Sequence, residues 1–182
     1  QGIRHLLLSA LPTRLVEALR SDEDRVLDLL DTATVVVFHI EGIVGNDGID
    51  EEAGVELSAG FSADIEAIAH QLGLERVRSS TDQHVFAAGL GTPEAAIEAA
   101  AEFALAVARM ADDFEQEHGL EITYRAALSA GEVISGLLGA DQLTYGVFGD
   151  PPRTALARAG VAGPKQILID DTTAAELSPQ WS

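Results

Sequence analysis

The stretch TVVVFHI at residues 34–40 is the part of the chain from which the fold can be built outward. Its side chains are β-branched and apolar, which is typical of a buried strand. Apolar residues at helical spacing then predict a helix over residues 53–72. Short strands are expected over residues 74–79 and 84–88, and because a tight turn separates them, they predict a β-hairpin.

The second half of the chain continues the alternation of strands and helices. Thr92 and Pro93 predict a helix start, because Thr caps helices and Pro is favoured at their first position, and this helix is expected to reach about His118. A strand pair broken by Gly131 and a short helix after Pro151 are also expected. Strands are expected at four places: residues 122–129, 132–138, 143–148 and 166–169. The order predicts an α+β fold with a ferredoxin-like βαββαβ core and extra C-terminal strands and helices.

Composition and charge narrow the class of protein. The 182 residues, 47% of them hydrophobic, suffice for one domain with a buried core. A net charge of −19, from 11 Lys and Arg against 30 Asp and Glu, repels nucleic acids and anionic lipid surfaces. The chain has no Cys, which excludes disulfides and thiol chemistry, and no apolar run long enough to span a membrane. We therefore expect a cytoplasmic protein with no nucleic-acid partner and no direct membrane contact from this segment.

Two parts are expected along the chain, a helical linker or stalk over residues 1–31 and a folded domain over residues 32–182. Leucines at positions 7, 8, 11, 15 and 19 favour a parallel pairing of two stalks, whereas Pro12 favours the alternative that these leucines cover the domain core. Because the chain begins with Gln1 rather than Met, we expect a segment of a longer protein. The upstream regions to consider in such a protein are a membrane tether and a sensor region.

Five motifs in series resemble one known family. They are VVVFHIEG at 35–42, ERVRSSTD at 75–82 with VFAAGL at 85–90, RAALSAG at 125–131, YGVFGD at 145–150, and VAG with ILI at 161–163 and 167–169. Each is weak alone, but they occur in the right order and on the expected strands and turns. On these motifs the chain resembles the catalytic domains of class III nucleotide cyclases, the adenylate and guanylate cyclase family, over nearly its whole length.

The resemblance implies a reaction in which the ribose 3′-hydroxyl of a nucleoside triphosphate attacks its own α-phosphate and releases pyrophosphate. Two Mg²⁺ or Mn²⁺ ions held by two aspartates would support it. One position is kept as Asp82, which serves either a metal or the tight turn, whereas the other falls on His39. Imidazole is a poor Mg²⁺ ligand, so His39 binds either a softer metal or none, and we favour none. Glu41 lies on the same strand face and is a further carboxylate to consider.

The resemblance also implies four positions that a second subunit contributes to the site. The residues that read adenine fall on Arg78 and Gly146, of which Arg78 keeps a positive charge and Gly146 has no side chain. The residues that orient the ribose and stabilise the transition state fall on Arg153 and Ala157. Because Ala157 occupies the transition-state position, an electrostatic contribution commonly worth about 10²-fold in rate is lost. Arg158 is about 100° further around the helix and is not expected to replace it.

Three interpretations remain open. We expect the first, a catalytically silent or severely impaired cyclase homology domain that forms a homodimer, or a heterodimer with another cyclase domain, and passes a signal within a larger protein. Such a domain needs no cofactor. The second is a divergent active cyclase that acts on ATP or GTP with Mg or Mn. The third is a sensor in which Arg78 and Arg153 bind a nucleotide or another anion without turnover.

Overall fold

The computed structural model describes residues 27–91, 94–138 and 144–177. The elements in these ranges are β1 (Leu27–Glu41), α3 (Glu51–Gln71), β2 (Glu75–Ser79), β3 (Gln83–Ala88), α4 (Ala96–His118), β4 (Thr123–Leu138), β5 (Thr144–Gly149), α5 (Asp150–Val161), β6 (Gln166–Ile169) and α6 (Asp171–Glu176). The first six elements confirm the predicted βαββαβ order, and β5, α5 and β6 are the predicted C-terminal additions.

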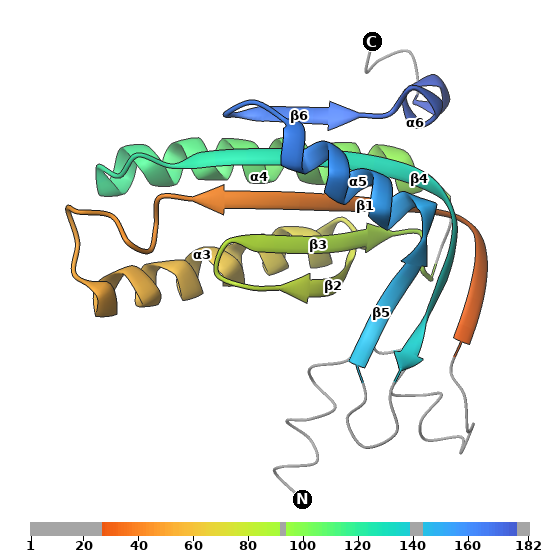
Figure 1. The fold of residues 1–182 in the computed structure, drawn as a ribbon, viewed down its shortest axis with the longest axis horizontal. Helices are drawn as coiled ribbons and strands as arrows, with labels where there is room; N and C mark the ends of the chain where they lie inside the picture. Colours follow the sequence, from red (N-terminus) through yellow and green to blue (C-terminus); the bar gives the residue numbers. More distant parts are fainter. Residues whose placement is uncertain (1–26, 92–93, 139–143, 178–182) are drawn as a thin grey trace, which may run out of the picture.

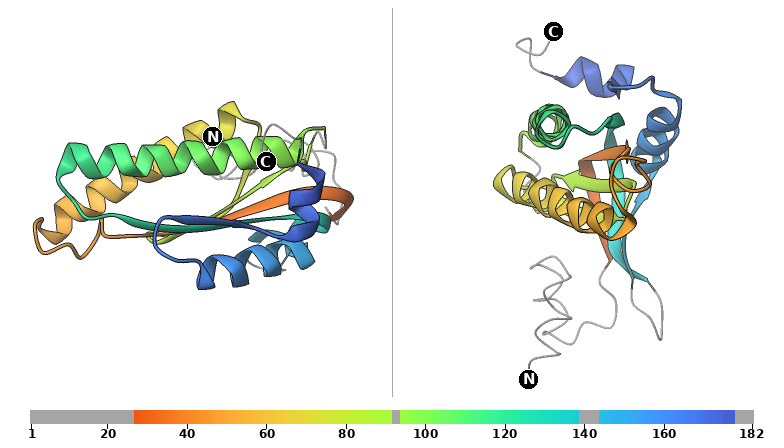
Figure 2. Two further views of the ribbon diagram at one scale, coloured as in Figure 1. Left: turned by 90° about the horizontal axis from the view of Figure 1, so that it is seen from above. Right: turned by 90° about the vertical axis from the view of Figure 1, so that its left-hand side faces the viewer.

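The strands form one mixed sheet in the order β2-β3-β1-β4-β5, with β6 parallel to β4 (Figure 1). The helices α3 and α4 cover one face, and α5 covers the other (Figure 2). In the central strand β1, Val36 and Phe38 pack in the core beneath α3 and α4, whereas Val35 and Val37 pack in the core on the α5 side. The strand is therefore buried on both faces, which explains its continuous apolar run.

Three strand segments extend beyond the body of the domain as an arm, made of residues 27–30, 133–138 and 144–149. Figure 1 shows the start of β1, the end of β4 and the whole of β5 running together at one end of the sheet. Leu29 is paired with Ile134, and Ile134 with Phe148. Residues 27–31, at the end of the expected linker, are part of β1, and residues 27–30 pair with β4. The rest of the expected linker and its leucines lie outside the described residues.

The strand β4 differs from the sequence prediction of two strands broken at Gly131. It is a single strand, and Gly131 lies inside it with a φ of 150°. The glycine faces the irregular part of β1 between Leu30 and Ala33, where the pairing register shifts. Glycine adopts this φ readily, so the strand bends into the arm instead of ending.

The helices also differ in detail from the prediction. α4 begins at Ala96, because Ala95 has a left-handed φ of 56° and interrupts the helix before that point. Thr92 and Pro93, where we expected the start, lie outside the described residues. α6 was not predicted, and the carboxylate of Asp170 caps it by accepting a hydrogen bond from the amide of Thr173. Within the described ranges, no helix combines the length and the apolar character needed to cross a bilayer.

Candidate functional site

The two positions expected to hold metal meet where β1 ends and the β2–β3 hairpin turns. His39 of β1 pairs with Gln83 of β3. The amide of Ile40 donates a hydrogen bond of 2.9 Å to the carbonyl oxygen of Asp82. Residues two apart share a strand face, so the His39 side chain lies on the same face as Val37, which is the α5 side. The fold therefore brings His39 and Asp82 together, as the resemblance implied.

The side chain of Gln83 links His39 to Arg78. The guanidinium of Arg78 donates to Oε1 of Gln83, which leaves the amide nitrogen of Gln83 facing the imidazole. That nitrogen lies 3.4 Å from Nε2 of His39 and can donate only to an unprotonated ring nitrogen. In the tautomer whose lone pair is on Nε2, that lone pair faces the amide of Gln83 and not a metal site. Sequence reasoning missed Gln83, although its place directly after Asp82 in the hairpin is a signal that could have found it.

Neither nearby carboxylate is arranged as a metal ligand. Asp82 is exposed and accepts a hydrogen bond of 3.0 Å from the hydroxyl of Ser80, which also bonds the backbone of Gln83 and so holds the hairpin turn. Glu41 forms an ion pair of 2.8 Å with Arg125 on β4. Among the described residues, no group of three or more His, Asp or Glu side chains could hold a metal ion. These donors do not fit the pair of Mg²⁺ ions that the reaction requires.

A groove brings together three of the other predicted positions. Its volume is about 600 Å³, and Arg78 of β2, Gly146 of β5 and Arg153 of α5 line it. Ala157 is exposed on α5 and does not line the groove, although it lies one helical turn beyond Arg153. The hydrogen bond of 3.4 Å from the hydroxyl of Tyr145 to Glu75 connects the β5 wall to β2.

The position expected to read a base is closed by an aromatic ring. A Cβ added to Gly146 would lie 2.4 Å from Cζ of Phe148 and 2.9 Å from its Cε2. Phe148 is two residues along the same strand, so its ring occupies the space that a side chain at position 146 needs. The position expected to read a base therefore has no side chain and borders an aromatic ring.

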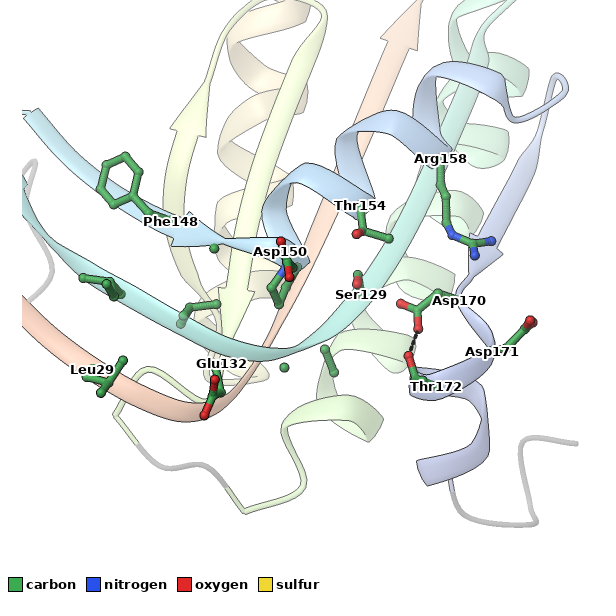
Figure 3. Close-up of a pocket in the computed structure, with 16 residues that line it drawn as sticks. Leu29, Ser129, Glu132, Phe148, Asp150, Thr154, Arg158, Asp170, Asp171 and Thr172 are labelled. Carbon is green, nitrogen blue, oxygen red and sulfur yellow. Dashed lines mark hydrogen bonds between the residues drawn. The ribbon is translucent and has the colours of Figure 1, made fainter.

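Arg153 and Arg158 do not supply the cation missing at Ala157. Arg153 pairs with Asp150 three residues earlier, and both side chains lie largely in solvent, at 79% and 84% exposure. Arg158 lines a different hollow of about 780 Å³, where it extends from α5 toward the side on which Asp170 and Asp171 lie (Figure 3). This agrees with the expectation that Arg158 points away from the site.

Asp170 holds α6 against β4 on the floor of that second hollow. Burial alone would raise the pKa of its carboxyl, but hydrogen bonds from the hydroxyls of Thr172, Ser129 and Thr173 and from the amide of Thr173 lower the pKa to about 2. Thr173 in turn accepts a hydrogen bond of 2.8 Å from the amide of Ala130 in β4. Sequence reasoning did not find this network, because Ser129 and Ala130 are about 40 residues away from Asp170, Thr172 and Thr173 in the chain.

The loop after β1 carries negative charge next to the end of the strand. A pocket there, of about 450 Å³, is lined by three carboxylates, those of Glu41, Asp47 and Glu121, and by no basic residue. The loop can pass close to this segment because Gly42 has a φ of 100°, and a Cβ at this glycine would lie 2.0 Å from the carbonyl oxygen of Glu121. Such a pocket repels a triphosphate. The sequence indicated only a turn-rich loop here.

Comparison with known proteins places this geometry in context. A model of the adenylate and guanylate cyclase catalytic domain matches residues 32–182. Adenylate cyclases of Mycobacterium tuberculosis and Mycobacterium bovis are 27% identical over 170 residues, which cover 91% of this chain and 38% of theirs. The chain thus spans less than half the length of these relatives.

Two solved structures share the fold. The guanylate cyclase domain of Catenaria anguillulae in complex with GTP has a TM-score of 0.71 at 23% identity and covers 81% of this chain and 82% of its own. A dimeric guanylyl cyclase domain of Blastocladiella emersonii has a TM-score of 0.72 at 21% identity, covering 81% of this chain and 84% of its own.

Proposed function

Because the chain belongs to the family of adenylate and guanylate cyclase catalytic domains, we propose that it is a catalytically silent member that dimerises and passes a signal within a larger protein. The observation that carries this proposal is the state of the first metal position. There a histidine replaces the carboxylate, and its ring nitrogen faces the amide of Gln83.

The expected metal position lacks the oxygen ligands that two divalent cations need. Two divalent cations beside a triphosphate need hard oxygen ligands, and the site offers one exposed carboxylate, that of Asp82, already bonded to Ser80. The carboxylates of Glu41, Asp47 and Glu121 line the loop pocket, but no described group of three acidic or histidine side chains could hold a metal ion. The shortage of suitably placed oxygen ligands therefore disfavours binding of Mg²⁺ with ATP or GTP.

Ala157 also leaves the transition state without the cation that the family resemblance implies at this position. A methyl group at Ala157 cannot meet the charge that develops on the leaving pyrophosphate, and a missing donor of this kind costs about 10² to 10³ in rate. Arg153 lies one turn away, but it contacts Asp150 and the carbonyl oxygen of Gly149 instead. Loss of the metal and of this cation together supports a rate far below that of an ordinary cyclase.

Dimerisation is supported by an exposed apolar row on the arm. Leu29, Ile134 and Phe148 lie side by side across β1, β4 and β5, and they are 73%, 44% and 41% exposed. A contiguous apolar row on a protein of net charge −19 is a candidate for contact with a second copy. The guanylyl cyclase domain of Blastocladiella emersonii, which shares the fold, has been solved both as a non-canonical dimer and as a monomer.

A cyclase assay tests the proposal. The purified chain is incubated with ATP or GTP and with Mg²⁺ or Mn²⁺, and the cyclic product is quantified by mass spectrometry, with Asp82→Ala as the matched control. We expect product at background in every combination and no effect of the substitution. Turnover approaching about 10 s⁻¹, abolished in Asp82→Ala, would refute silence. Activity with Mn²⁺ alone would favour a divergent cyclase that uses His39 as a ligand.

A further inference from the structure

We propose that the groove between β2 and β5 binds an organic anion of low charge with an apolar body, such as an aliphatic carboxylate, through Arg78 and Arg153. This inference rests on the proposed function only in that a silent domain leaves the groove free for a ligand other than substrate. The volume of about 600 Å³ lies within the range of small-molecule sites.

The walls of the groove are mostly apolar. The apolar residues that line it come from four strands and one helix: Val37, Val77, Val85, Val147, Phe148, Pro152 and Leu156. Val77 reaches the groove because the register of β2 shifts between Arg76 and Arg78, so that Val77 and Arg78 both lie opposite Val85. The bulge therefore places an apolar side chain and a cationic side chain next to each other.

The charge of the groove is opposite to that of the protein. Two arginines line it and no carboxylate does, although the chain as a whole carries a net charge of −19. The hydrogen bond of Arg78 to Gln83 is to a neutral amide, which a carboxylate replaces with a stronger charge-assisted contact. The pair of Arg153 with Asp150 is largely in solvent, so exchanging Asp150 for a ligand carboxylate costs little.

The same features disfavour a nucleoside triphosphate. The ring of Phe148 fills the space at Gly146, so no side chain is there to hydrogen-bond a base. The remaining side-chain hydroxyls are those of Thr144 and Tyr145, and Tyr145 already donates to Glu75. Two exposed arginines, one of them paired with Asp150, do not balance the charge of a triphosphate. An anion of one charge with an aliphatic body fits the charge and the walls together.

Octanoate is a suitable probe, with 1-octanol, inorganic phosphate and ATP as comparisons. Binding to the full chain is measured by isothermal titration calorimetry and by ligand-observed NMR at constant ionic strength. The variants are Arg78→Gln and Arg153→Gln. The matched controls are Arg76→Gln, whose guanidinium pairs with Glu66, and Arg158→Gln, which lines the second hollow.

We expect octanoate to bind with a Kd near 1 mM, and at least about tenfold more tightly than 1-octanol or phosphate. Each groove variant should raise this Kd about fivefold, and each control variant less than about twofold.

Four outcomes would overturn the inference: no octanoate binding up to about 10 mM, equal binding of 1-octanol, tighter binding of ATP, or an equal effect of all four variants. Tighter binding of ATP would also contradict the weak nucleotide binding expected above, but only the cyclase assay decides silence, so failure here is distinguishable from failure of the proposed silence.

Discussion

Replacing Asp170 by Asn tests how the network beneath α6 stabilises the domain. The side chain is only 6% exposed, and its pKa of about 2 lies below the ordinary value of 3.8. A carboxyl whose pKa is lowered by folding contributes stability that is present above pH 3.8 and is lost as the pH falls toward 2. The lowered pKa corresponds to about 2 kcal/mol of stability at pH 7, of which about 1 kcal/mol remains at pH 3.

The assay is urea unfolding followed by circular dichroism from pH 7 to pH 2.5. Many other carboxyl groups titrate in this range, so the informative quantity is the difference in unfolding free energy between wild type and Asp170→Asn at each pH. This difference should be about 2 kcal/mol at neutral pH and should shrink below pH 4. The exposed neighbour Asp171 provides the control variant Asp171→Asn, which should change stability by less than about 0.5 kcal/mol. A difference for Asp170→Asn that stays constant with pH would refute the reasoning.

Three further predictions concern the core, the groove and the arm. Phe103→Ala should lower the unfolding free energy by about 3–5 kcal/mol in urea titrations, because this ring is fully buried and contacts Phe38 and Phe86. A loss below about 1 kcal/mol would contradict this packing. Gly146→Asp should not create nucleotide binding. It should lower the unfolding free energy by about 1–2 kcal/mol, because the new side chain clashes with Phe148. If the loss is the same in a Phe148→Ala background, the clash is not its cause. Leu29→Glu should convert the dimer to monomers at about 50 µM, as measured by light scattering. The control Val161→Glu, at a residue that is 79% exposed on α5, should leave the dimer intact.

The sequence by itself determined the order of the elements and the family. Local patterns carry that information, because apolar runs, helical spacing and turn residues act over a few positions along the chain. The run at residues 34–40, the hairpin around Asp82 and the strand of Phe148 all lie where they were predicted. The same local reasoning failed at Gly131 and at Ala95, because there the backbone φ, and not the residue pattern, decides whether an element continues.

Only the tertiary structure decided which side chains meet. The contact of Gln83 with both Arg78 and His39 depends on the pairing of three strands, and the network of Asp170 depends on α6 returning to β4. The gathering of two arginines in an apolar groove likewise follows from the placement of α5 beside the sheet. Such contacts join residues up to 84 positions apart, as for Arg125 and Glu41, and no pattern within a short window encodes them.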